Sequence, residues 1–264
     1  MHFSSLIEVV SATVLSRYVQ GPFEERSGMF FIAPAGHLKT TAIEILDEFD
    51  RTLMVTNLTN KTLNAMRQDA ISGQINVIGF ADWEMIYRRH GSVSAQIEGS
   101  IMSLAGEGYR NPSFTDQRVT AIPARCTVLG CMTTKFYERM YENWNDSGFL
   151  RRFLFPQYRL ANPEQLEDSI LKWKKAELDG NFILKTPTNR SIPYNLEEKE
   201  TEVIRHSLRF VKYDKKIPLI LAQKVFCVLK WKFQRSDPKR PLFIWKDFAE
   251  SLGKNGAILE LGKT

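Results

Sequence analysis

The sequence has few cysteines, and this shortage limits the kinds of site that it can build. Only three of its 264 residues are cysteine: Cys126, Cys131 and Cys227. They stand in apolar surroundings and lack the spacing of a zinc site or of a disulfide framework. We therefore expect small core residues in a reducing compartment, with neither disulfides nor zinc.

The chain also lacks long hydrophobic runs and a recognisable leader segment. No stretch approaches the roughly 20 apolar residues that a membrane-spanning helix needs. The first residues, M-H-F-S-S-L-I-E, carry neither the basic start nor the small-residue cleavage site of a signal peptide. These absences predict a cytoplasmic protein with no membrane partner.

Charge is distributed unevenly along the chain, whose formal net charge is +6. Residues 201–264 contain 14 Lys and Arg but 6 Asp and Glu, a net charge of +8, so residues 1–200 carry −2. A near-neutral body with a basic C-terminal part indicates an anionic partner, for which nucleic acid is the best fit. A solvated basic surface explains the same charge equally well.

Apolar runs alternate with amphipathic segments over the first 160 residues. We expect strands over Met29–Ala33, Thr52–Asn57, Gln74–Asp82, Ala124–Thr134 and Phe149–Phe155. We expect helices over Leu6–Leu15, Thr40–Phe49, Lys61–Ser72, Trp83–Arg89, Ser94–Leu104 and the segment that ends near Trp144. Strands that alternate with helices favour an α/β domain with a mainly parallel sheet covered on both faces.

After Pro156 the pattern changes, so we divide the chain into units 1–160 and 161–264. Residues 163–175 and 195–212 predict polar amphipathic helices, and Pro218–Phe233 predicts a more apolar one. The stretch Leu242–Leu252 fits the opening of a helix-turn-helix or winged-helix element.

Glycine is scarce where the most informative motif requires it, in A-P-A-G-H-L-K-T-T at residues 33–41. The stretch lies between a predicted strand and a predicted helix, as a phosphate-binding loop G-x-x-x-x-G-K-[ST] does. Lys39 and Thr40 match the motif, but Ala33 and Leu38 replace its glycines, and leucine resists a positive φ. The stretch predicts a divergent phosphate loop, with an ordinary turn and an exposed lysine as the alternative. The residues expected to contact nucleotide here are Ala35, Gly36, His37, Leu38, Lys39, Thr40 and Thr41.

Polar residues follow two other predicted strands. Asp82 and Glu84 come after the strand that begins at Gln74, where a carboxylate can hold Mg²⁺ and another can polarise water. A simple helix cap is the other interpretation of Asp82. Thr133 and Thr134 end the next strand, where a hydroxyl can contact a γ-phosphate or cap a helix.

Two arginines, Arg151 and Arg152, follow the turn at Gly148. An arginine at such a place can stabilise transition-state charge across a subunit boundary, or form a surface ion pair.

Taken in order, the phosphate loop, the acid-tipped strand, the polar-tipped strand and G-F-L-R-R-F at residues 148–153 resemble a P-loop ATPase of the ASCE and AAA+ type. In particular they are similar to helicase-like ATPases of phages and mobile elements, which are in turn similar to minichromosome-maintenance helicases. The resemblance covers roughly residues 28–160. Asp82-Trp83-Glu84 departs from the family's adjacent acid pair.

This resemblance implies a three-layer αβα P-loop sandwich over residues 1–160, followed by a helical lid and part of a winged helix. It implies ATP and Mg²⁺ as cofactors, with Lys39 on phosphate, Thr40 and Asp82 on Mg²⁺, and Glu84 as the base. It further implies Thr133 or Thr134 as γ-phosphate sensor, and Arg151 or Arg152 acting on a neighbouring subunit of a homo-oligomer. If a phage encodes the chain, its location is the host cytoplasm.

The sequence therefore predicts an ATP-hydrolysing helicase or motor-like protein of nucleic-acid metabolism, with DNA favoured over RNA. The alternative is a DNA-binding or partner-binding module that binds nucleotide without turnover, and Leu38 favours it. A third interpretation is an α/β protein with no phosphate site.

Overall fold

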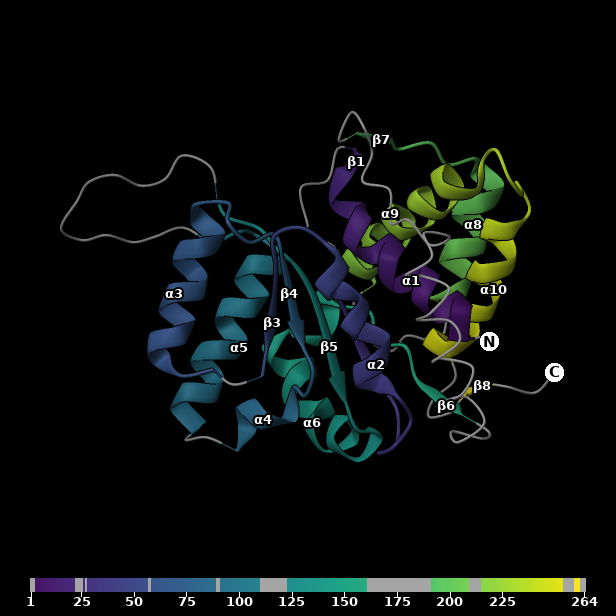
Figure 1. Cartoon of the computed structure of the whole chain (residues 1–264). Coiled ribbons are helices and arrows are strands. Elements are labelled where there is room, and N and C mark those ends of the chain that lie inside the picture. Colours follow the sequence, from purple (N-terminus) through teal and green to yellow (C-terminus); the bar gives the residue numbers. More distant parts are fainter. Residues whose placement is uncertain are drawn as a thin grey trace.

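A parallel four-stranded sheet forms the centre of the computed structural model (Figure 1). The structure describes residues 3–21, 26, 28–56, 58–88, 91–109, 123–160, 191–208, 215–253 and 259–261. The strand order is β2-β5-β4-β3, and every neighbouring pair is parallel. The strands are β2 (Gly28–Ile32), β3 (Thr52–Val55), β4 (Val77–Phe80) and β5 (Thr127–Met132).

Residues 154–157 extend this sheet beyond β2. The Phe30 amide donates to the Leu154 carbonyl at 2.8 Å, and the Ile32 amide donates to the Pro156 carbonyl at 2.9 Å. Leu154 pairs with Met29 in a parallel bridge. Strand β2 therefore lies inside the sheet, between β5 and the 154–157 segment. Two short parallel pairs lie outside it, namely β1 (Val19–Gln20) with β7 (Ile192–Pro193) and β6 (Tyr158–Leu160) with β8 (Leu259–Leu261).

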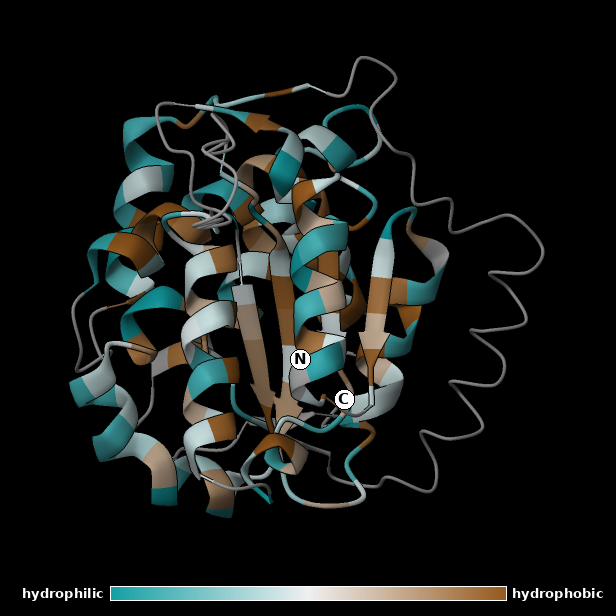
Figure 2. Ribbon diagram, turned by 90° about the vertical axis from the view of Figure 1, so that its left-hand side faces the viewer, coloured by the Kyte–Doolittle hydropathy of each residue, from teal (hydrophilic) through white to brown (hydrophobic). Residues whose placement is uncertain are grey.

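Helices cover both faces of the sheet, because alternate residues of each strand pack into different layers. In β2, Met29 and Phe31 join the core formed with α1, α2 and α9, whereas Phe30 and Ile32 join the core formed with α3, α5 and α6. Figure 2 shows the apolar strands between these helical layers. The predicted α/β class with a covered parallel sheet is confirmed. The helices of the α/β part are α2 (Lys39–Glu44), α3 (Asn60–Ile71), α4 (Glu84–Tyr87), α5 (Gly91–Ala105) and α6 (Thr134–Ser147).

A second helical unit packs beside the layer that contains α2. It consists of α1 (Phe3–Leu15), α8 (Glu198–Ser207), α9 (Lys216–Phe233) and α10 (Arg240–Gly253). Helix α1 is buried from Ser5 to Leu15, and Glu8 forms an ion pair with Lys232 of α9. The N-terminal helix thus packs against helices from beyond residue 160, and the predicted division at that residue stays a prediction. Among the described residues, no helix is both long and apolar enough to cross a membrane.

The sequence-based prediction is wrong for the first half of Phe149–Phe155. Leu150–Arg152 forms one 3-10 turn, and the extended chain begins only after it. The reason is local, because Gly148 ends α6 with a left-handed φ of 76° and the buried Phe149, Leu150 and Phe153 all turn inward. The predicted helix over residues 163–175 lies outside the described residues. Within the described part β8 pairs with β6 rather than forming a wing beside α10.

Candidate functional site

The predicted phosphate loop lies where the chain connections of two neighbouring strands diverge. After β2 the chain continues through α2 toward β3, at the far edge of the sheet, whereas after β5 it continues through α6 to 154–157 on the opposite side of β2. In open parallel α/β sheets, ligands bind outside the carboxyl ends of two such strands. The loop at residues 33–38 and Thr133 both occupy this position.

The loop backbone is left-handed at two residues, and one of them, Leu38, disfavours that conformation. Gly36 has a φ of 75°, and Leu38 also lies in the left-handed region, with φ 54° and ψ 28°. This region costs an L-residue about 1–2 kcal/mol, whereas glycine enters it freely. Leu38 is the residue that replaces the motif's second glycine, so the backbone there takes up a conformation natural to glycine despite the side chain.

Lys39 begins α2, and its side chain reaches back across the loop. Its Nζ donates to the Pro34 carbonyl at 2.7 Å. Burial lowers the pKa of Lys39, while electrostatic interactions with Cys131, Glu84 and Asp82 act in the opposite direction. Lys39 is thus within electrostatic range of both predicted acidic residues.

Asp82 and Glu84 follow β4 and are held beside the end of β5. The Trp83 amide donates to the Cys131 carbonyl at 2.8 Å, which extends the pairing of the two strands. Asp82 Oδ1 accepts from the Glu84 amide at 3.0 Å, which forms an Asx turn just before the short helix α4, and Asp82 remains exposed. Glu84 Oε1 accepts from the Thr133 amide at 2.7 Å and thereby links the ends of β4 and β5.

Thr133 acts as the N-cap of α6, because its hydroxyl accepts from the Phe136 amide at 3.2 Å. Thr134 is the first residue of that helix, and both threonines are half-buried. The structure thus brings Lys39, Asp82, Glu84 and Thr133 together at one edge of the sheet. The remaining predicted loop residues line the same turn: Ala35, Gly36 and Thr40 are exposed, and His37 and Thr41 are half-buried.

A magnesium ion bound with a nucleotide needs few protein ligands, because phosphate oxygens and waters complete its shell. The Thr40 hydroxyl and the Asp82 carboxylate are exposed oxygen donors of the right kind. No group of three or more His, Cys, Asp and Glu side chains gathers as a metal site within the described ranges. The residues present therefore fit a metal brought by a nucleotide rather than a site built by the protein alone.

The predicted arginines lie toward the amino end of β2, at the end of the sheet opposite the phosphate loop. Arg152 Nη2 forms an ion pair with Glu107 at 2.8 Å, and its Nη1 donates to the Gly148 carbonyl at 3.0 Å. Leu154, two residues later, donates its amide to the carbonyl of Gly28, where β2 begins. The five residues of β2 separate that end from the phosphate loop by about 13 Å. One chain therefore does not place its own arginines in its own loop site.

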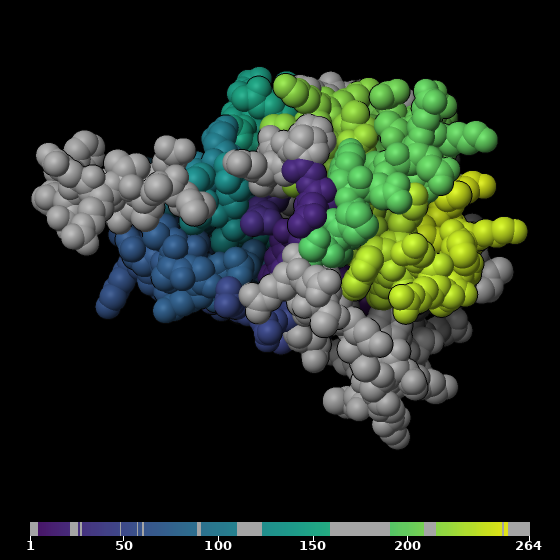
Figure 3. Space-filling view, turned by 90° about the horizontal axis from the view of Figure 1, so that it is seen from above, coloured from purple at the N-terminus to yellow at the C-terminus, as the bar shows by residue number. Residues whose placement is uncertain are grey.

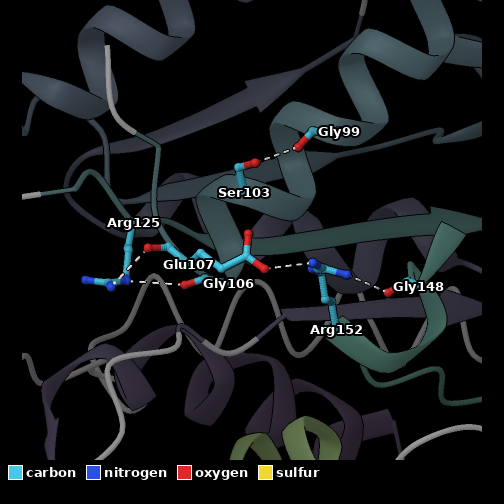
Figure 4. Close-up of polar contacts among 7 residues, drawn as sticks. All are labelled: Gly99, Ser103, Gly106, Glu107, Arg125, Gly148 and Arg152. Carbon is cyan, nitrogen blue, oxygen red and sulfur yellow. Dashed lines mark hydrogen bonds and ion pairs between the residues drawn. The ribbon is translucent and has the colours of Figure 1, made fainter. Parts of the chain in front are cut away.

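The two arginines differ in their surroundings. Arg151 is exposed, whereas Arg152 is half-buried and occupied by Glu107 and Gly148. Arg125 lies near Arg152 and donates to the carbonyls of Gly106 and Glu107 at 3.2 and 3.1 Å (Figure 4). The surface ion pair considered from the sequence is thus formed by Arg152.

Sequence reasoning missed two contributors to the site. Cys131 Sγ contacts the Lys39 carbonyl at 3.0 Å, which fixes the start of α2 against the end of β5. Tyr87, at the far end of α4, donates its hydroxyl to Glu98 of α5, and Trp144 of α6 donates to that hydroxyl at 2.9 Å. The position of Cys131 near the end of a predicted strand indicated that it could lie close to the site. Nothing in the sequence linked Tyr87 to Trp144.

The chain matches no protein-family model, and comparison with curated proteins finds no match.

Proposed function

We propose that the chain is an ATP-binding and ATP-hydrolysing P-loop protein of the AAA+-like kind, acting in nucleic-acid metabolism as a helicase or motor-like module. The observation that carries this proposal is the convergence of Lys39, Asp82 and Glu84 at the strand ends where ligands of parallel α/β sheets bind. A loop with two left-handed residues stands at the same place. An ordinary strand–helix turn needs none of these acidic neighbours.

Each residue has a defined part in the proposed reaction. Lys39 leaves the Pro34 carbonyl and binds phosphate oxygens, while Thr40 and Asp82 would hold Mg²⁺, which would supply positive charge against the phosphates. Glu84 accepts a proton from water. The water oxygen attacks the γ-phosphorus, the bond to the β–γ bridging oxygen breaks, and ADP and phosphate leave.

A second function is favoured by one specific contact. Glu84 Oε1 is occupied by the Thr133 amide at 2.7 Å, so it must release that donor or use its other oxygen before it can act on water. If Glu84 did neither, the site would bind ATP without turnover, as a nucleotide-dependent DNA-binding or partner-binding module.

Melting temperature measured with and without ATP and Mg²⁺ tests binding. At about 100 times its dissociation constant, a ligand stabilises by about 2.7 kcal/mol. For a chain of this size that corresponds to a rise of about 5–10 °C. Lys39→Ala should remove the rise. Lys135→Ala is the matched control, because Lys135 is exposed on α6 near the site and should leave the rise unchanged.

Phosphate release, measured with and without DNA, separates the two functions. We expect hydrolysis by the wild type that DNA increases, and a loss of about 100-fold or more in Glu84→Gln with binding retained. A rise in melting temperature with ATP and Mg²⁺ but without phosphate release would support the non-hydrolysing module. If ATP and Mg²⁺ did not change the melting temperature of the wild type, the chain would be an α/β protein without a phosphate site.

A further inference from the structure

Helix α10 exposes apolar side chains on its outer face. Among the described residues, the large hydrophobic side chains that are exposed are Val203 at 42%, Leu242 at 44% and Phe243 at 54%. Two of the three are neighbours near the start of α10. Figures 1 and 3 show α10 at the outside of the helical unit, beside α8.

The inner face of α10 holds the helix firmly in place. Ile244, Trp245 and Phe248 are fully buried, and Trp245 Nε1 donates to the Ser207 hydroxyl of α8 at 3.1 Å. The Trp245 ring also packs edge-on against Phe226 of α9, with the ring centroids 5.7 Å apart. Because helical residues keep fixed faces, Leu242 and Phe243 cannot turn inward without losing these contacts.

Lysines stand on both sides of the exposed apolar pair. Lys239 immediately precedes α10, and its carbonyl accepts from the Phe243 amide at 3.3 Å. It is therefore spaced at i, i+3, i+4 and i+7 with Leu242, Phe243 and Lys246, and we call this set the α10 stripe. All four side chains are exposed. Neither lysine ammonium forms an ion pair with the residues that the structure describes, whereas Lys230 and Lys232 of α9 are paired with Glu200 and Glu8.

The other charges near this stripe leave it basic. Arg235 and Asp237 are exposed in the turn before α10, and Asp237 Oδ1 accepts from the Lys239 amide at 3.1 Å. Asp247 is half-buried on the flank of the helix. Positive side chains thus bracket a ring and an aliphatic side chain, with one exposed carboxylate in the preceding turn.

We propose that the α10 stripe binds single-stranded nucleic acid, with Lys239 and Lys246 on phosphates and the Phe243 ring stacked against a base. The two lysines are separated by about 10 Å along the helix, which leaves room for an intervening nucleotide. Aromatic rings flanked by cations are the usual platform for unpaired bases, whose faces a duplex hides. An anionic membrane fits less well, because two apolar side chains offer little surface to bury in lipid.

The proposal deepens the nucleic-acid role proposed above, but it does not need the ATP site. Binding of fluorescein-labelled oligothymidine, measured by anisotropy without nucleotide and over a range of salt, tests it on the full chain. Lys239→Gln with Lys246→Gln should weaken binding at least about 10-fold at low salt. It should also reduce the salt slope by about 1.4, because each phosphate contact on a single strand contributes about 0.7. The control carries Lys61→Gln and Lys199→Gln, two exposed lysines on α3 and α8.

Phe243 gives an independent readout. Phe243→Ala should weaken binding about 5- to 150-fold with the salt slope unchanged, because stacking contributes about 1–3 kcal/mol per base. Phe243→Trp should retain affinity and show quenched fluorescence on binding. The Phe243 side chain is exposed, so the melting temperatures of both variants should stay close to that of the wild type.

Three outcomes would overturn the proposal. They are equal binding by the lysine variant and its control, a preference for duplex that Phe243→Ala leaves unchanged, or binding to phosphatidylserine vesicles in place of oligonucleotide. If the wild type bound no oligonucleotide, the α10 stripe would fail as a nucleic-acid site. The melting shift with ATP and Mg²⁺ would still decide the proposed ATP site separately.

Discussion

At the scale of single residues, Leu38 is the position where sequence and backbone disagree. Its left-handed backbone stores strain, while its half-buried side chain packs against the core beside α2. Leu38→Gly removes both the strain and the packing, and Leu38→Ala removes the packing alone. We therefore expect Leu38→Gly to be the more stable variant by about 1 kcal/mol, or about 2–4 °C in melting temperature. Equal melting temperatures would show that the loop relaxes without cost.

Some residues of the candidate site could be predicted because they stand at fixed distances from strand ends. Lys39 and Thr40 follow a buried apolar run, and Asp82 follows another, so their shared edge was foreseeable. The Glu84–Thr133 hydrogen bond was not, since it depends on which two strand ends become neighbours in space. The left-handed backbone of Leu38 could not be predicted either. Conformational propensity describes what leucine prefers, whereas the surrounding fold decides which conformation the loop adopts.

At the scale of elements, one carboxylate joins three helices. Glu98 of α5 accepts from the Tyr87 hydroxyl, from Trp144 Nε1 at 3.2 Å and from the Ser147 hydroxyl at 3.1 Å. Burial, and then the Glu98 charge, raise the pKa of Tyr87 far above its ordinary value, so its hydroxyl stays a donor. Since α4 has four residues, fixing Tyr87 at its end also limits the movement of Glu84 at its start.

We expect Glu98→Ala to lower the free energy of unfolding by about 2–3 kcal/mol, because it leaves buried donors without their charged acceptor. Urea unfolding measures the change, and Glu138→Ala, at an exposed position of α6, should cost less than about 0.5 kcal/mol. A cycle with Tyr87→Phe should show a coupling of about 0.5–3 kcal/mol. Additive losses would mean that the network does not act as a unit.

Long elements were predictable from their hydrophobic pattern, whereas their ends and short turns were not. The apolar run of β2 and the largely apolar stretch of α9 identified both elements, because burial on several sides dictates the residue types. The sequence pattern predicts a strand where Leu150–Arg152 forms a 3-10 turn, because a single turn is too short to show a helical period. The packing of α1 against α9 was beyond prediction, because more than 200 residues separate them.

At the scale of the whole molecule, residues for one proposed reaction lie at opposite ends of the parallel strands. The loop with Lys39 lies at the carboxyl ends of the strands, and the exposed Arg151 lies toward their amino ends. If Arg151 stabilises charge on the γ-phosphate, it must come from a second copy packed head to tail, which is a heterologous arrangement. Arg152 is the less suitable of the two, because Glu107 and the Gly148 carbonyl already occupy it.

Mixing two inactive variants tests this arrangement. Lys39→Ala and Arg151→Ala should each lose ATP hydrolysis, but their equal mixture should recover about a quarter of the wild-type rate, as random head-to-tail pairing dictates. The recovered sites combine a loop with intact Lys39 and an intact Arg151 from the neighbouring copy. Arg152→Ala should instead lower the melting temperature, because it breaks the ion pair with Glu107. A mixture as inactive as its components, with native mass spectrometry showing mixed assemblies, would place the arginine outside the reaction.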